Sequence, residues 1–144
     1  MGAGAIVGVL AWLLALSICD IRERRLPDTL TLSGAAVVLA VAAATGRGLP
    51  AACGAVALFA VYLSVYLLAP GAMGGGDVKL AAGLGALTGT FGVDVWVLAA
   101  VGAPVLTAGL AVVASVARRA ATVPHGPSMC LASGGALALT LPWP

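Results

Sequence analysis

The chain contains very few charged residues. Only 8% of its 144 residues are Asp, Glu, Lys or Arg, whereas 62% are hydrophobic and the mean hydropathy is +1.14. A soluble domain of this length could not present so little polar surface to water. The composition therefore excludes an ordinary soluble globular protein and predicts an integral membrane protein.

The sequence also lacks the alternation of apolar and polar residues that is typical of membrane β-barrel strands. Its apolar runs are long and unbroken. In a bilayer, only helices and closed barrels satisfy their backbone hydrogen bonds internally. We therefore predict an all-α integral membrane protein, a compact bundle of about six transmembrane helices.

Metal and nucleotide motifs are missing as well. Cys19, Cys53 and Cys130 are odd in number and scattered, with no C-x-x-C pair, which argues against a disulfide framework or a zinc site. The glycine run in "GAMGGGDVKL" (71–80) lacks the G-K-[ST] ending of a P-loop. We expect no metal, no cofactor and no nucleic-acid partner.

Six apolar segments approach the length needed to cross a bilayer, which is roughly 20 residues with about 17 as the lower limit. Pro50 and Pro70 bound the third segment because proline cannot donate a helical hydrogen bond. The first segment has no positive residues before it and no cleavage site after it, so we expect a retained helix rather than a signal peptide. We expect one transmembrane domain over residues 1–144, with helices at 2–19, 29–45, 51–69, 79–93, 95–117 and 127–143.

The basic residues predict the orientation, because loops on the cytoplasmic side are enriched in Lys and Arg. Only Arg47 falls on the opposite side of the predicted membrane. The cytoplasmic loops, after the first, third and fifth predicted helices, hold Arg22, Arg24, Arg25, Lys79, Arg118 and Arg119.

Two of the five acids are predicted to meet. Asp20 ends the first predicted helix and Asp77 begins the fourth, so both emerge at the cytoplasmic side. Two carboxylates close together in a poorly solvated site cannot both ionise easily, so one keeps a proton. The charged acid can then deprotonate a water while the protonated acid donates to a carbonyl oxygen, which is the chemistry of peptide hydrolysis.

The residues around this pair suggest supporting roles. The glycines at 74–76 carry no side chains, so we expect an extended peptide substrate to bind along them. Asp28 follows Pro27 at a good N-cap position for the second helix. Lys79 is about 200° around a helix from Asp77 and is interpreted as an anchor at the membrane interface.

The remaining acids have structural interpretations. Glu23 belongs to the charged cluster "IRERR", and Asp94 is interpreted as a solvated or capping residue. Two other functions remain open from these residues. A small proton-coupled transporter or channel subunit would need acids near the middle of the membrane, and an inactive scaffold of a secretion system would need no chemistry.

Three stretches resemble the signatures of the prepilin peptidase (type IV leader peptidase) family of membrane aspartyl proteases: "CDIRERRLPDTLTL", "GGGDVKLAAGLGAL" and "VPHGPSMCLASGGAL". The resemblance implies that Asp20 and Asp77 are the catalytic aspartates, and that Gly74 and Gly76 are the motif glycines before the second. It implies a peptidase of the bacterial cytoplasmic membrane that removes the leader of pilin-like precursors at the cytoplasmic face.

The chain departs from the family pattern in three ways. Asp28 stands where asparagine is usual, which adds a third carboxyl near the site. His125 replaces an aromatic residue in "PHGP", and we expect it to be a solvated or packing residue. The cysteine-rich domain of the larger bifunctional members is not present, so we expect cleavage without N-methylation.

Overall fold

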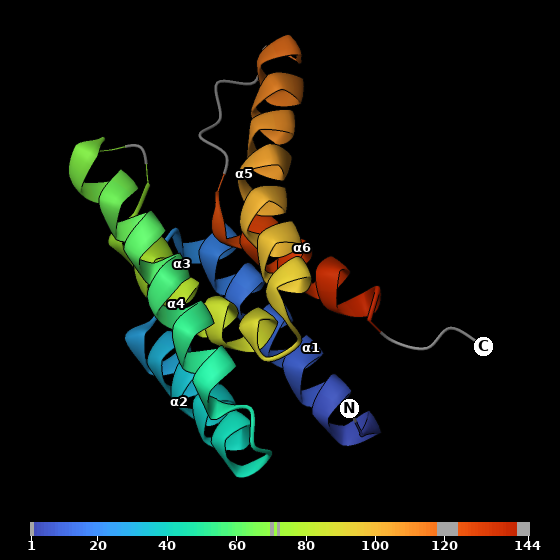
Figure 1. Cartoon of the computed structure of the whole chain (residues 1–144). Helices are drawn as coiled ribbons and strands as arrows, with labels where there is room; N and C mark the ends of the chain where they lie inside the picture. The colour runs from blue at the N-terminus through green and yellow to red at the C-terminus, as the bar shows by residue number, and fades with distance from the viewer. Residues whose placement is uncertain (1, 70, 72, 118–123, 141–144) are drawn as a thin grey trace.

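The computed structural model describes residues 2–69, 71, 73–117 and 124–140, which form helices joined by short connections (Figure 1). These residues contain no strand, and the predicted all-α fold is confirmed for them. The six helices are α1 (Ala3–Glu23), α2 (Asp28–Ala44), α3 (Gly48–Leu68), α4 (Gly75–Gly89), α5 (Val93–Val116) and α6 (Gly126–Ala138).

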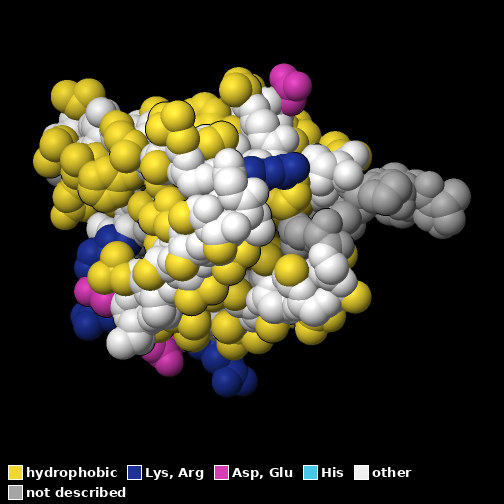
Figure 2. All heavy atoms as spheres, turned by 60° about the horizontal axis from the view of Figure 1, so that its bottom comes forward, with side chains coloured by type: hydrophobic (Ala, Val, Ile, Leu, Met, Phe, Trp, Pro, Cys, Tyr) yellow, Lys and Arg dark blue, Asp and Glu magenta, His cyan; other side chains and the backbone are white. Residues whose placement is uncertain are grey.

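Among the helices described, α1, α3 and α5 are long and apolar enough to cross a membrane, with 21, 21 and 24 residues. The 17-residue α2 is a shorter apolar helix. Large apolar side chains on these helices point outward, for example Leu14, Val61 and Val112. Figure 2 shows hydrophobic side chains spread over the visible surface, with charged residues in a few places only. Such a surface suits lipid rather than water.

The short helix α4 forms the centre of the bundle and packs against α2, α3, α5 and α6. Eleven of its 15 residues are buried. With a rise of about 1.5 Å per residue it is roughly 22 Å long, which is less than the ~30 Å hydrocarbon core. Because most of its residues are buried, α4 is surrounded mainly by the other helices and not by lipid.

Glycines allow α4 to lie directly against α3. A Cβ atom on Gly85 would lie 2.4 Å from the carbonyl oxygen of Gly54, and a Cβ on Gly54 would lie 2.4 Å from the carbonyl oxygen of Gly85. The indole N–H of Trp96 on α5 donates to the same Gly54 carbonyl at 3.0 Å. Only residues without a side chain permit this approach of two backbones.

Several helix boundaries differ from the predicted ones. The first helix continues to Glu23, so Asp20 lies within its last turn. The third begins at Gly48, which places Pro50 in its first turn. Proline is tolerated there because N–H groups of the first turn have no acceptor within the helix. The fourth helix begins at Gly75 instead of residue 79, so Asp77 lies inside its first turn.

The last helix ends at Ala138 in the described chain, whereas the sequence predicted an end at residue 143. Other predictions fall outside the described residues, namely those for Pro70, Arg118, Arg119 and residues 141–143.

The two ends of the bundle differ in charge. Arg22, Arg24, Arg25 and Lys79 lie at the end where α1 stops and α4 begins. At the opposite end, Arg47 donates to the carbonyl oxygen of Thr90 at 3.4 Å. The described basic residues are therefore distributed unequally between the two ends of the bundle, as the sequence predicted.

Candidate active site

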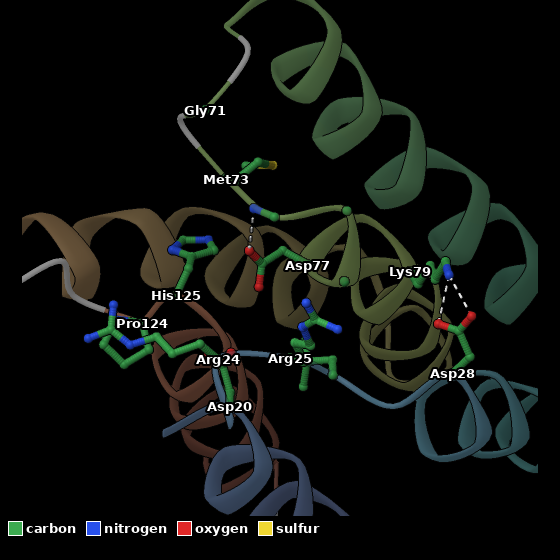
Figure 3. Close-up of a pocket in the computed structure, with 14 residues that line it drawn as sticks. Asp20, Arg24, Arg25, Asp28, Gly71, Met73, Asp77, Lys79, Pro124 and His125 are labelled. Atoms are coloured by element: carbon green, nitrogen blue, oxygen red, sulfur yellow. Dashed lines mark hydrogen bonds and ion pairs between the residues drawn. The ribbon is translucent and has the colours of Figure 1, made fainter. Parts of the chain in front are cut away.

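A pocket of about 440 Å³ opens at the end of the bundle that carries most of the charge (Figure 3). It lies where α1 ends and where α2, α4 and α6 begin. Every site residue predicted from the sequence borders this one pocket: Asp20, Asp28, Gly74, Gly75, Gly76, Asp77 and Lys79.

Asp20 is held by the start of α6. Its side chain is 8% exposed, and its Oδ2 accepts the backbone N–H of Gly126 at 3.0 Å. The first N–H groups of a helix have no acceptor within that helix, so this one is available to a neighbouring carboxylate. A Cβ on Gly126 would lie 2.7 Å from Asp20 Oδ2. A side chain at this position would therefore push the Asp20 carboxylate out of its place.

Asp77 is held by the residue before α4. Its side chain is also 8% exposed, and its Oδ2 accepts the N–H of Gly74 at 3.1 Å. In return, the N–H of Asp77 donates to the Gly74 carbonyl at 3.1 Å. This reciprocal pair fixes the carboxyl over the first turn of α4.

The surroundings of Asp77 favour its neutral form. Burial raises the pKa of this carboxyl from 3.8 to about 6. The Gly74 hydrogen bond opposes the change in pKa, and the charge of the nearby Asp20 adds to it. Figure 3 shows the two acids entering the pocket from different walls, Asp20 from α1 and Asp77 from α4. Asp20 is therefore near enough for its charge to affect the ionisation of Asp77.

The glycine run 74–76 is mostly helical. Only Gly74 is extended, with φ −83° and ψ 151°, and it is the N-cap of α4. Gly75 and Gly76 already belong to the first turn. A Cβ on Gly76 would lie 3.2 Å from the Leu26 Cβ, so this turn packs closely against the connection between α1 and α2. The substrate-binding role of these glycines stays a prediction.

The N-cap prediction for Asp28 is wrong. Pro27, with φ −65° and ψ 130°, is the N-cap of α2, and Asp28 is the first helical residue. Its carboxylate instead meets Lys79, whose Nζ lies 2.6 and 2.7 Å from the two oxygens. Lys79 thus ties α4 to α2, and Figure 3 shows it turned away from Asp77. The side chains of Lys79 and Asp28 are 43% and 59% exposed, so the pair contributes at most about 1 kcal/mol.

His125, expected to be a solvated or packing residue, is half-buried in the pocket wall and also makes two side-chain hydrogen bonds. Its Nε2 lies 3.0 Å from the Tyr62 hydroxyl, and its Nδ1 lies 2.6 Å from the Thr107 hydroxyl. Burial lowers the pKa of His125, and the charge of Asp20 opposes this effect. Sequence reasoning missed Tyr62, Thr107 and Gly126. Pro127 was the one local signal for Gly126. Proline is common in the first turn of a helix, where backbone N–H groups have no acceptor within the helix.

No group of three His, Cys, Asp or Glu residues suited to a metal ion occurs among the residues described. The pocket can instead perform acid–base chemistry with two carboxyls. Taken together, these features define a membrane protein of apolar helices whose pocket holds two buried acids.

The sequence model of the type IV leader peptidase family matches residues 7–112. This segment is most of the chain and contains both acids, so the chain belongs to the type IV leader peptidase family. The resemblance found in its motifs is confirmed, and membership implies a peptidase of the aspartic type. Comparisons with curated proteins and with solved structures gave no match.

Proposed function

We propose that this protein is a membrane aspartyl endopeptidase that removes the N-terminal leader of prepilin or pilin-like precursors. Family membership supports a leader peptidase in general. One observation carries the assignment of the chemistry: Asp20 and Asp77, which are 57 residues apart in the sequence, are both buried in the wall of one pocket.

We further propose that the pocket faces the cytoplasm of a bacterium, at its inner membrane. The basic residues around the pocket support this orientation, because positive charge gathers on the cytoplasmic side of membrane proteins. Arg24, Arg25 and Lys79 all line the pocket. In this orientation the leader reaches the two acids without crossing the bilayer.

In the active form proposed here, the pair of acids holds one proton, and Asp77 carries it because burial raises its pKa to about 6. The Asp20 carboxylate takes a proton from a water molecule, and the water oxygen bonds to the scissile carbonyl carbon. Asp77 donates its proton to the carbonyl oxygen. When the carbon–nitrogen bond breaks, the proton on Asp20 passes to the leaving amine, and the proton on the former carbonyl oxygen returns to Asp77.

The start of α4 supports a binding site for the substrate backbone. Gly75 and Gly76 lie in its first turn, where N–H groups have no acceptor within the helix. Because neither residue carries a side chain, a peptide can approach these groups closely. Leu26 and Met73 add apolar wall to the same pocket. Its volume of about 440 Å³ suits a short peptide segment rather than a folded domain.

The test is co-expression of the protein with a candidate precursor, read as a mobility shift on a gel. Asp20→Asn and Asp77→Asn are each expected to reduce processing by about 10²–10⁴-fold while the protein still inserts in the membrane. Asp94→Asn is the matched control, because Asp94 is an exposed acid outside the pocket. Processing at the normal rate by either Asp20→Asn or Asp77→Asn contradicts the proposed function.

A further inference from the structure

His125 joins three helices at the edge of the pocket. It is the only histidine of the chain and immediately precedes α6. Its ring contacts Tyr62 on α3, which is 5% exposed, and Thr107 on α5. The rings of His125 and Tyr62 are 5.7 Å apart and tilted by 38°. Two hydroxyls from different helices therefore hold one imidazole ring.

The hydrogen-bond partners determine which ring nitrogen carries the proton. The Thr107 hydroxyl donates its single hydrogen to the carbonyl oxygen of Ala103 at 3.0 Å. Its oxygen can therefore only accept from His125, so the imidazole proton lies on Nδ1. Nε2 is then an acceptor, and the Tyr62 hydroxyl donates to it. A neutral ring satisfies both contacts, and burial of this residue favours the neutral form.

The residue that follows connects this ring to the acid pair. The N–H of Gly126 donates to Asp20 Oδ2 at 3.0 Å. Its position depends on the backbone at His125, whose carbonyl also accepts the N–H of Met129 at 3.1 Å. His125 lies on the wall of the pocket (Figure 3). A single peptide unit thus separates His125 from the N–H that binds the Asp20 carboxylate.

We propose that His125 is a positioning residue: held by Tyr62 and Thr107, it fixes the start of α6 so that the Gly126 N–H keeps Asp20 in place for peptide hydrolysis. This inference rests on the proposed function. A phenylalanine at this position would fill the same space but could not make either hydrogen bond, so the role depends on the two ring nitrogens.

Magnetic resonance of the protein with isotope-labelled histidine tests the hydrogen bonds without any activity, because the chain has one histidine. The wild type is expected to show the neutral tautomer with the proton on Nδ1. Thr107→Val removes the acceptor and is expected to move the proton to Nε2. Thr45→Val is the matched control, because Thr45 also donates to the carbonyl four residues earlier, at 2.9 Å, but lies at the other end of the bundle. A wild-type ring protonated on Nε2 overturns the proposal.

Kinetics with a purified protein and a precursor peptide test the positioning role. Tyr62→Phe and Thr107→Val are each expected to lower kcat about tenfold, because small displacements of a reacting group are costly, and to leave KM within about twofold. Thr107→Ser keeps the hydroxyl and is expected to restore kcat. Tyr66→Phe is the control for Tyr62→Phe, because Tyr66 lies on the same helix, α3, but is 41% exposed. A change in KM alone, or no rescue by Thr107→Ser, contradicts positioning.

The Asp20→Asn variant, assayed alongside, separates the two proposals. If Asp20→Asn still processes the peptide, the proposed function fails, whatever the His125 variants do. If Asp20→Asn is inactive while Tyr62→Phe and Thr107→Val keep the wild-type kcat, only the positioning role fails. Thermal unfolding of each variant verifies that a lost rate does not come from lost structure.

Discussion

Replacing Gly85 by alanine tests whether the glycine contact between α3 and α4 sets the position of Asp77. The added Cβ would lie 2.4 Å from the Gly54 carbonyl oxygen, 3.0 Å from the Gly54 carbonyl carbon and 2.8 Å from the Leu58 Cβ. A carbon–oxygen contact between packed helices is about 3.3 Å or longer. Backbone atoms of α3 cannot rotate away as a side chain can, so the two helices must separate by about 1 Å.

The free-energy change has two parts of opposite sign. Overpacking of this kind destabilises a protein by about 1–3 kcal/mol, whereas alanine in a helix interior is about 1 kcal/mol more favourable than glycine. Gly135→Ala on α6 is the matched control, because Gly135 is exposed and an added Cβ would meet nothing within 4 Å. The Gly135→Ala variant gains only the higher helix propensity of alanine. The difference between the two variants isolates the steric cost, about 1–3 kcal/mol.

The same displacement should reach the acid pair. Asp77 lies eight residues before Gly85 on α4, which is about 12 Å along the helix axis. A helix this short moves as a unit, so Asp77 shifts relative to Asp20. Misplacing a reacting group by about 1 Å can reduce a rate about 10²-fold. We therefore expect slower processing even under conditions where the Gly85→Ala protein is fully folded.

Two measurements decide the matter: the free energy of unfolding in detergent micelles, and the rate of precursor processing well below the unfolding transition. Gly135→Ala is expected to be as stable as the wild type or more stable, and equally active. If Gly85→Ala matches it in both stability and rate, the close contact between α3 and α4 does not exist as described, and the position of Asp77 does not depend on it.

Two further predictions concern the acids directly. Gly126→Ala places a Cβ 2.7 Å from Asp20 Oδ2. Because the carboxylate can swing aside, we expect a small loss of stability, but because Asp20 is then displaced, we expect a large loss of processing. Both are measured in the same two assays. Processing should also decline as the pH rises through about 6, because Asp77, whose pKa is raised to about 6, then loses the shared proton. A pH profile that rises instead would make Asp77 the base.

The fold class and the meeting of the two acids were predictable because each depends on a strong signal. In a bilayer these apolar segments can satisfy their backbone hydrogen bonds only as helices. The positions of the Arg and Lys residues indicate that the end of the first helix and the start of the fourth lie on the same side of the membrane. The start of α4 was not predictable in this way. Gly75 and Gly76 have low helix propensity, yet both lie in the first turn of α4, where Gly76 packs against Leu26.

Contacts between distant residues were the part that the sequence could not reveal. A local rule made Asp28 a helix cap, yet its partner Lys79 lies 51 residues away. The hydrogen bond between Tyr62 and His125 spans 63 residues. Neither residue type nor spacing encodes such a pairing, because it depends on how distant helices are arranged in the folded protein. The role of a buried polar residue therefore needed the tertiary structure.

The bond between Asp20 and Gly126 also has a consequence for biosynthesis. The two residues are separated by 106 positions, so the acid enters the membrane with α1 long before its partner is synthesised. During translation, Asp20 has no Gly126 N–H to accept, and the pocket has no wall from Pro124 or His125. The site is completed only when α6 has been inserted. A partly made chain without α6 therefore lacks the assembled pocket.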